Sequence, residues 1–182
     1  LFEPSKKRGS VVDRVRDYEE TIDELENEII ALLALTARAA TSADAARQIG
    51  EMSQNTHRLE RMADHCEKLL EIAIRHHQLD QEERMGGGTM EELHEMSKIV
   101  ARSVEHLMAY LDGTGTLAEA NAIEQEVNEM RDQLRAQHLN RVIAGEADLV
   151  PQLIFLDAIH VLEEIGDRCV GIIRRAEETR LM

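Results

Sequence analysis

Acidic residues spaced four positions apart recur in segments of this chain that have helical periodicity. In an α-helix, residues i and i+4 lie on one face one turn apart, where two like charges destabilise the helix by roughly 0.2–0.5 kcal/mol. A repeated unfavourable arrangement indicates that a cation binds there. The pairs are Glu19 with Asp23, Glu60 with Asp64, Glu163 with Asp167 and, with an amide as the second member, Glu124 with Asn128.

The turn between the first two helical segments places their acidic pairs at equal heights. Asp23 precedes Ser42 by 19 residues and Glu60 follows it by 18, so two antiparallel helices bring these side chains level. Glu19 and Asp64 are level by the same count. We therefore expect four carboxylates on one patch, across two helices packed about 8–10 Å apart.

The second set of pairs behaves in the same way. With a turn near residue 147, Asn128 is level with Glu163, and Glu124 with Asp167, to within one helical turn. Oxygen donors of this kind bind Mg²⁺, Ca²⁺, Mn²⁺ or oxidised iron, and Zn²⁺ is a further candidate. The missing charge of Asn128 predicts that the second cluster binds metal less tightly. Solvated faces paired with arginines are the alternative interpretation.

Two histidines accompany the acidic pairs. His57 and His160 each precede a repeated glutamate by three residues and lie on the same helical face as it. We expect them to be additional metal ligands or hydrogen-bonding neighbours of the ligands. The alternative is that they are ordinary polar residues at the interface of the hairpin.

The acidic pairs belong to an internal duplication. The segment around His57 matches the segment around His160 at a constant offset of 103 residues, and the segment around Glu19 matches that around Glu124 at an offset of 105. Because the two offsets nearly agree, a whole helical hairpin is duplicated, not a single motif. The first offset matches His57, Leu59, Glu60, Asp64 and Cys66 with His160, Leu162, Glu163, Asp167 and Cys169.

The composition indicates an all-α fold. Aromatic residues make up 2% of the chain, and the only prolines are Pro4 and Pro151. Strand-type runs of β-branched and aromatic residues are missing, whereas apolar residues recur at spacings of three and four. The pattern predicts about five long helices, arranged as two pseudo-symmetric antiparallel hairpins or three-helix-bundle repeats.

Helix-capping residues indicate where the helices begin. A serine or threonine followed three residues later by an acid is typical of a helix start, which predicts starts at Ser10, Thr89 and Thr116. Ser42 is the predicted cap of the second helix. The expected organisation is a polar tether (1–9), a first repeat of two helices (10–80), a Gly-rich linker (81–88) and a second repeat of three helices (89–182).

The charge and the apolar pattern exclude several classes of protein. The formal net charge is −15, which argues against nucleic acid as a partner and favours metal cations or a basic protein surface. No apolar run is long enough to span a bilayer, and no signal peptide is visible. Cys66 and Cys169 form neither a disulfide framework nor a zinc pattern. We therefore expect a cytoplasmic setting.

These motifs resemble those of the PhoU family of phosphate-transport regulators. The family's sequence of hydrophobic-Glu-Arg-hydrophobic-small-Asp stands at residues 59–64 (LERMAD) and recurs at residues 162–167 (LEEIGD). The resemblance covers roughly residues 11–180 and departs from the family motif at Asn128. It implies two related three-helix bundles, multinuclear metal clusters (often of iron) on the carboxylate face, and a regulatory, non-enzymatic role in phosphate uptake.

Two departures bear on the setting of the chain. A free-standing PhoU protein should carry a helix before the first hairpin, and it should carry Pro-x-Ala-x-Asp-Leu-Arg where residues 45–49 read AARQI. Both resemble the cytoplasmic PhoU-like tail of bacterial Na⁺/phosphate cotransporters, and a start at Leu1 with basic residues 6–8 fits a segment leaving a membrane. The implied partner is the transporter's membrane domain in cis. For a free-standing regulator, the implied partner is a phosphate transport or sensor protein. A homo-oligomer is a further alternative.

Two rival functions predict different behaviour. A di-iron oxidase of the ferritin-like type needs Glu-x-x-His pairs facing a bundle core, but the order here is His-x-x-Glu, as in His57 and Glu60. A purely structural helical scaffold would respond neither to metal nor to a chelator.

Overall fold

The computed structural model describes residues 8–81, 85–145 and 148–180 of the chain. This part of the chain folds into five α-helices and contains no strand, which confirms the all-α prediction. The helices are α1 (Arg8–Ala39), α2 (Ala43–Gln78), α3 (Gly87–Leu111), α4 (Leu117–Ile143) and α5 (Leu149–Arg180).

Several helix ends lie where the capping residues predict. The Ser42 hydroxyl accepts a hydrogen bond from the Ala45 N–H at 3.1 Å and begins α2. The Thr116 hydroxyl likewise accepts from the Glu119 N–H at 3.2 Å and begins α4. α3 ends at Leu111, and the turn after it contains Gly113, whose φ of 83° is a conformation that residues with a side chain rarely adopt.

Two predicted starts are wrong. α1 begins at Arg8, so Ser10 lies inside the helix instead of capping it. α3 begins at Gly87 after an N-cap at Gly86, and Thr89 is a buried helical residue. Its expected capping partner, Glu92, instead contacts α4, so tertiary contacts decide its role.

The predicted tether and linker lie partly outside the described residues. Of the tether over 1–9, residues 1–7 lie outside, and the remainder is the first turn of α1. Of the linker over 81–88, residues 82–84 lie outside, and the last two residues are already helical in α3.

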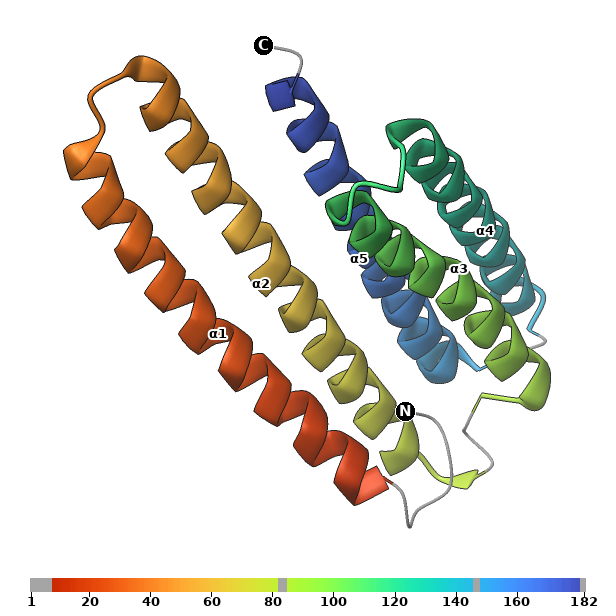
Figure 1. Cartoon of the computed structure of the whole chain (residues 1–182). Helices are drawn as coiled ribbons and strands as arrows, with labels where there is room; N and C mark the ends of the chain where they lie inside the picture. Colours follow the sequence, from red (N-terminus) through yellow and green to blue (C-terminus); the bar gives the residue numbers. More distant parts are fainter. Residues whose placement is uncertain (1–7, 82–84, 146–147, 181–182) are drawn as a thin grey trace.

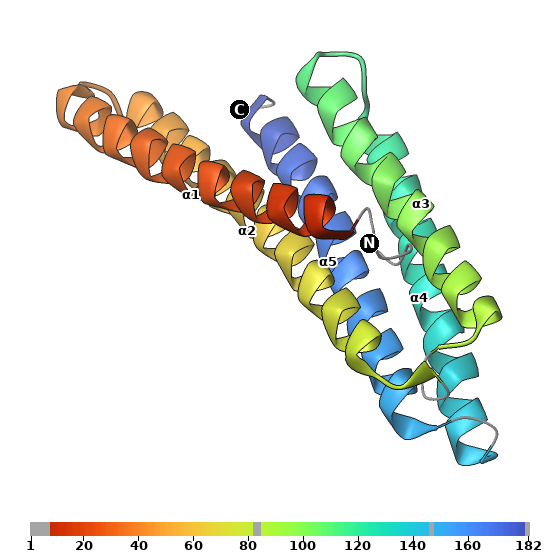
Figure 2. The ribbon, with the colours of Figure 1, turned by 90° about the horizontal axis from the view of Figure 1, so that it is seen from below.

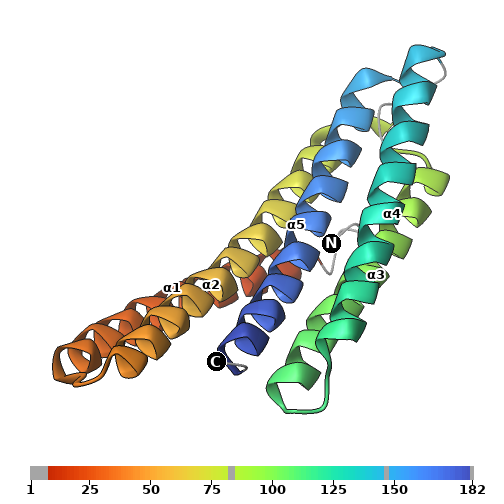
Figure 3. The same cartoon turned by 90° about the horizontal axis from the view of Figure 1, so that it is seen from above.

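α5 is the central helix of the molecule. It packs against α2, α3 and α4, whereas α1 makes extensive contact only with α2 within the described ranges (Figure 1). The second repeat is therefore a closed three-helix bundle of α3, α4 and α5, and the first repeat is a two-helix hairpin of α1 and α2. The end of this hairpin near residues 40–42 extends away from the bundle (Figures 2 and 3).

The apolar core lies mainly within the second repeat. Phe155 and Ile159 of α5, Leu134 of α4 and Met96 of α3 are almost completely buried there. α2 reaches the same core through Ile72, near its C-terminal end. The stability of the fold is therefore concentrated in the bundle, because burial of apolar area is the largest favourable contribution to folding.

A buried polar network joins three helices at one end of the bundle. The His138 ring of α4 is 0% exposed and stacks on Phe155, with ring centroids 3.8 Å apart. Its Nε2 lies 2.7 Å from a carboxylate oxygen of Glu92 in α3, and its Nδ1 contacts the Gln152 amide oxygen in α5. Arg141 binds the same carboxylate at 3.0 Å.

No helix in the described part of the chain has an apolar stretch long enough to cross a bilayer.

Candidate metal centre

The first carboxylate cluster forms where α1 and α2 face each other. Glu19 and Asp23 of α1 and Asp64 of α2 each offer an oxygen atom, and these oxygens all lie within 4.8 Å of one another. The antiparallel hairpin thus brings together acids that are far apart in sequence, with Glu19 and Asp64 at the same level, as the residue count from Ser42 predicts. Glu60, one helical turn before Asp64, borders the same patch.

The electrostatics of this cluster favour a cation. Burial and the neighbouring Asp64 carboxylate raise the pKa of Glu60 to about 7. Burial, followed by the charges of Asp23 and other acids, also raises the pKa of Glu19. Within the described ranges, none of the four carboxylates forms an ion pair with a lysine or arginine. The cluster therefore carries a repulsion that a bound cation would relieve.

His57, predicted as an additional ligand or a neighbour of the ligands, contacts a different acid. Its Nδ1 pairs with the carboxylate of Glu26, which lies on α1 one turn beyond Asp23. The His57 side chain is more than half exposed, whereas that of Glu26 is largely buried. This pair extends the acidic face by one helical turn on each helix.

The second cluster already contains a cation. The Arg131 guanidinium donates to the Asn128 side-chain oxygen at 2.8 Å and to the Glu163 carboxylate at 2.5 Å. Arg174 of α5 lies 3.4 Å from the Glu124 carboxylate. Burial and the charges of Glu163 and Glu124 still raise the pKa of Asp167, although Arg131 opposes the rise.

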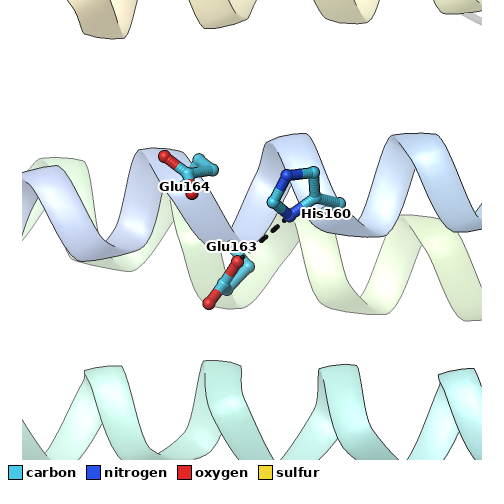
Figure 4. A group of neighbouring side chains, drawn as sticks. All are labelled: His160, Glu163 and Glu164. Carbon is cyan, nitrogen blue, oxygen red and sulfur yellow. Dashed lines mark ion pairs between the residues drawn. The ribbon is translucent and has the colours of Figure 1, made fainter.

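The other predicted histidine, His160, lies beside this second cluster (Figure 4). Its Nδ1 is 3.4 Å from a carboxylate oxygen of Glu163, and His160, Glu163 and Glu164 offer ligand atoms within 4.8 Å of one another. Glu164 also pairs with Arg168 at 3.1 Å. Two of the three potential donors are thus bound to arginines.

Sequence reasoning missed the residues that distinguish the two clusters. The offset of 105 residues that aligns the first hairpin helix with its copy also aligns Glu26 with Arg131, a reversal of charge at one position. Asn128 is not merely a missing charge, because its side-chain oxygen accepts from Arg131. The alignment of the two repeats contains this signal, although tertiary structure is needed to see that the guanidinium enters the cluster.

The first cluster has the chemistry of a site for a hard cation. Clustered carboxylate oxygens suit Mg²⁺, Ca²⁺, Mn²⁺ or oxidised iron, and the exposed Asp64 leaves the patch open to solvent. Cys66, two residues beyond Asp64, is about 200° around the helix from it, so no thiolate belongs to the donor set.

Comparison with known proteins shows that the chain matches a known domain family. Residues 5–73 and 93–176 match the PhoU domain, so the match covers most of the chain in two segments. The two segments correspond to the two repeats. No curated protein and no solved structure matches the chain.

Proposed function

This chain belongs to the PhoU family, and we propose that it is a non-catalytic regulatory domain that binds metal through the first carboxylate cluster. Membership of the family indicates a regulatory role related to phosphate. The finer proposal is that a hard cation, with iron as the leading candidate, holds α1 against α2 and so fixes the conformation of the hairpin.

The observation that carries this proposal is the unpaired state of the first cluster. Glu19, Asp23 and Asp64 approach within 4.8 Å without a basic partner in the described residues, and the pKa of Glu60 is raised beside them. Such crowding destabilises the hairpin unless a cation is bound. A bound metal would relieve the repulsion among these carboxylates. The stability of the hairpin would therefore increase when metal binds.

For the second cluster we propose weaker binding or none. A metal would have to displace Arg131 from Asn128 and Glu163, and the Arg131 charge would then lie beside the metal. We therefore assign Glu124, Asn128, Glu163 and Asp167 a structural role in joining α4 to α5, in which Arg131 takes the place of a metal.

The proposed setting is a phosphate transporter. We infer that the domain lies in the cytoplasm and acts on the membrane domain of a Na⁺/phosphate cotransporter in cis. The alternative is a free-standing regulator that contacts phosphate transport or sensor proteins. The departure of residues 45–49 from the motif of free-standing PhoU proteins supports the first setting.

Elemental analysis tests the metal proposal. Protein purified without chelator should contain metal, and the double variant Glu60→Ala/Asp64→Ala should lose it. The matched control is Glu163→Ala/Asp167→Ala, which removes the corresponding acids of the second repeat and should retain most of the metal. Circular dichroism checks that both variants remain helical. Equal metal content in the wild type and the first variant, or absence of metal from the wild type, would contradict the proposal.

Phosphate uptake by cells tests the setting. If the domain regulates a transporter, the Glu60→Ala/Asp64→Ala variant should change uptake at unchanged protein abundance. Uptake that is identical in the wild type and the variant would contradict the regulatory link while leaving metal binding untouched.

A further inference from the structure

The contact between α2 and α5 changes character along its length. Near the C-terminus of α2, Ile72 and Val161 of α5 belong to the apolar core. At the offset of 103 residues, Ile72 corresponds to Arg175 and Val161 to Arg58, so two arginines stand at the other end of the contact. We call this end the cationic seam, and it consists of Arg58 and His65 of α2 and Arg168, Gly171 and Arg175 of α5.

The guanidinium groups of the cationic seam lie near one another across the two helices. Burial, followed by the charges of Arg175 and Arg168, lowers the pKa of Arg58. On α5 the spacing of three and four residues puts Arg168, Gly171 and Arg175 on one face. Arg58 therefore lies across from Gly171, with a guanidinium of α5 one helical turn to either side. Toward this end of the contact the two helices diverge (Figures 2 and 3).

Gly171 leaves space between the arginines. A Cβ atom at this position would meet nothing within 4 Å, although the residue is half-buried. The corresponding residue of the first repeat is Lys68, whose long side chain borders the apolar end of the contact. The absence of a side chain at Gly171 therefore allows a small ligand to approach the backbone of α5.

Buried donors of the cationic seam lack partners. Arg168 Nε and His65 Nε2 are buried and have no hydrogen-bond partner among the described residues. Arg58 donates to the side-chain oxygen of Asn55 at 3.2 Å but forms no ion pair in this part of the chain. Desolvated cations and unsatisfied donors are costly unless an opposite charge binds them, so the cationic seam favours an anion.

The charge of the cationic seam is only partly balanced. Glu164 binds Arg168 at 3.1 Å and lies 3.7 Å from His65 Nε2, so it offsets one guanidinium charge. Glu60 of the first carboxylate cluster is about 200° around α2 from Arg58 and lies on the other side of that helix. Arg58 thus keeps an uncompensated charge, although the whole chain is strongly acidic.

From these contacts we propose that the cationic seam binds a phosphate-type oxyanion, held between Arg58 and Arg168 beside Gly171. A guanidinium group offers paired N–H donors that match the oxygen atoms of a phosphate. A tetrahedral dianion can accept hydrogen bonds from α2 and α5 at once, whereas a planar carboxylate carries a single charge and fewer acceptor directions. The bound anion would hold the first repeat against the second, because its donors come from both.

Anion titration tests the proposal. Inorganic phosphate and glycerol 3-phosphate are titrated at low salt into the whole chain, treated with chelator and checked for helicity by circular dichroism. We expect one site per chain, and a midpoint of thermal unfolding about 3 °C higher at about tenfold excess over the Kd. Binding of inorganic phosphate alone would assign the site to the free ion, and binding of both would assign it to phosphate groups in general.

Variants separate anion binding from a structural role. Arg58→Val introduces the residue that the second repeat carries at the corresponding position. It should weaken phosphate binding by about tenfold or more, and it should raise the midpoint of thermal unfolding without phosphate, because it removes repulsion between cations. Arg168→Gln should weaken binding to a similar extent. The matched control Lys98→Gln/Arg102→Gln removes two exposed cations of α3 and should leave phosphate binding unchanged.

Three results would overturn the proposal. The first is that neither anion binds, and the second is an equal rise in the midpoint of thermal unfolding with sodium chloride at the same ionic strength. The third is phosphate binding that Arg58→Val and Arg168→Gln leave unchanged or weaken no more than the control does. The protein carries no metal in this experiment, so its outcome is independent of the proposed metal site.

Discussion

Residue 26 is a glutamate in the first repeat, and the corresponding residue 131 is an arginine in the second. In the first repeat, Glu26 adds a negative charge to the acidic cluster and contacts His57. In the second repeat, Arg131 donates hydrogen bonds to both Asn128 and Glu163. The negative charge of the first cluster thus has no lysine or arginine partner in the described residues, whereas that of the second cluster is partly neutralised by Arg131. Duplication therefore preserved the register of the acids but not their electrostatic role.

The two repeats also differ in how they are covered. Leu33 of the first repeat corresponds to His138 of the second, which is buried beneath Phe155 and joined to Glu92 of α3. The second repeat thereby gains a polar connection to its covering helix. In the first repeat, with no such helix in the described ranges, the position is an apolar contact within the hairpin.

The largest expected effect comes from making the second repeat resemble the first at this position. His138→Leu should lower the free energy of unfolding by about 3 kcal/mol, because Gln152 loses its buried partner and Glu92 keeps only Arg141. Urea denaturation measures the change. The neighbouring exposed variant Leu139→Ala should cost about 0.5 kcal/mol or less. A loss below about 1 kcal/mol for His138→Leu would show that the network contributes little.

Exchanging the charges of residues 26 and 131 tests the electrostatic difference directly. Glu26→Arg places a guanidinium beside the first cluster and should weaken metal binding by about 10–100-fold. Arg131→Glu removes the internal cation from the second cluster and should add a second class of metal site. Calorimetric titration of chelator-treated protein with Mn²⁺ measures both changes.

The two variants Glu26→Arg and Arg131→Glu serve as controls for each other. If Arg131→Glu leaves the stoichiometry unchanged while Glu26→Arg still weakens binding, then Asn128 and not Arg131 limits the second cluster. If both variants bind as the wild type does, the charge at this position does not decide where metal binds.

A smaller effect should appear in the pH dependence of stability of the metal-free protein. Glu60 has a pKa of about 7 in the folded state against an ordinary value of 4.5, so the folded state binds more protons between these limits. The free energy of unfolding should therefore fall as the pH rises from about 4.5 to 7, by about 1 kcal/mol after solvent screening. Thermal unfolding measures it, and Glu60→Gln should flatten the slope. The same slope in both proteins would exclude Glu60 as its source.

The helices and their register could be read from the sequence because they depend on local and periodic information. Apolar spacing predicts the five helices, Ser42 and Thr116 cap theirs as expected, and residue counts from Ser42 place Glu19 and Asp64 at one height. Each of these properties depends on the geometry of one helix or one tight turn.

The properties that escaped prediction depend on which element packs against which. Thr89 has the sequence of a helix cap, but Glu92 binds His138 and Arg141 of α4 instead of completing the cap. Nothing in the local sequence of Arg131 indicates that its side chain enters the acidic cluster. Such contacts join segments tens of residues apart and are decided by three-dimensional packing.

The smallest effect concerns the duplicated cysteines, which report how each repeat is covered. Cys169 is 2% exposed in the core, and burial raises the pKa of its thiol to about 12, whereas Cys66 is exposed. A thiol reagent at pH 8 should therefore modify Cys66 at least about 100-fold faster than Cys169, with no effect on stability. Burial also raises the pKa of the Cys66 thiol, so its labelling should be slower than that of an unfolded control. Equal labelling rates at Cys66 and Cys169 would contradict this difference in burial.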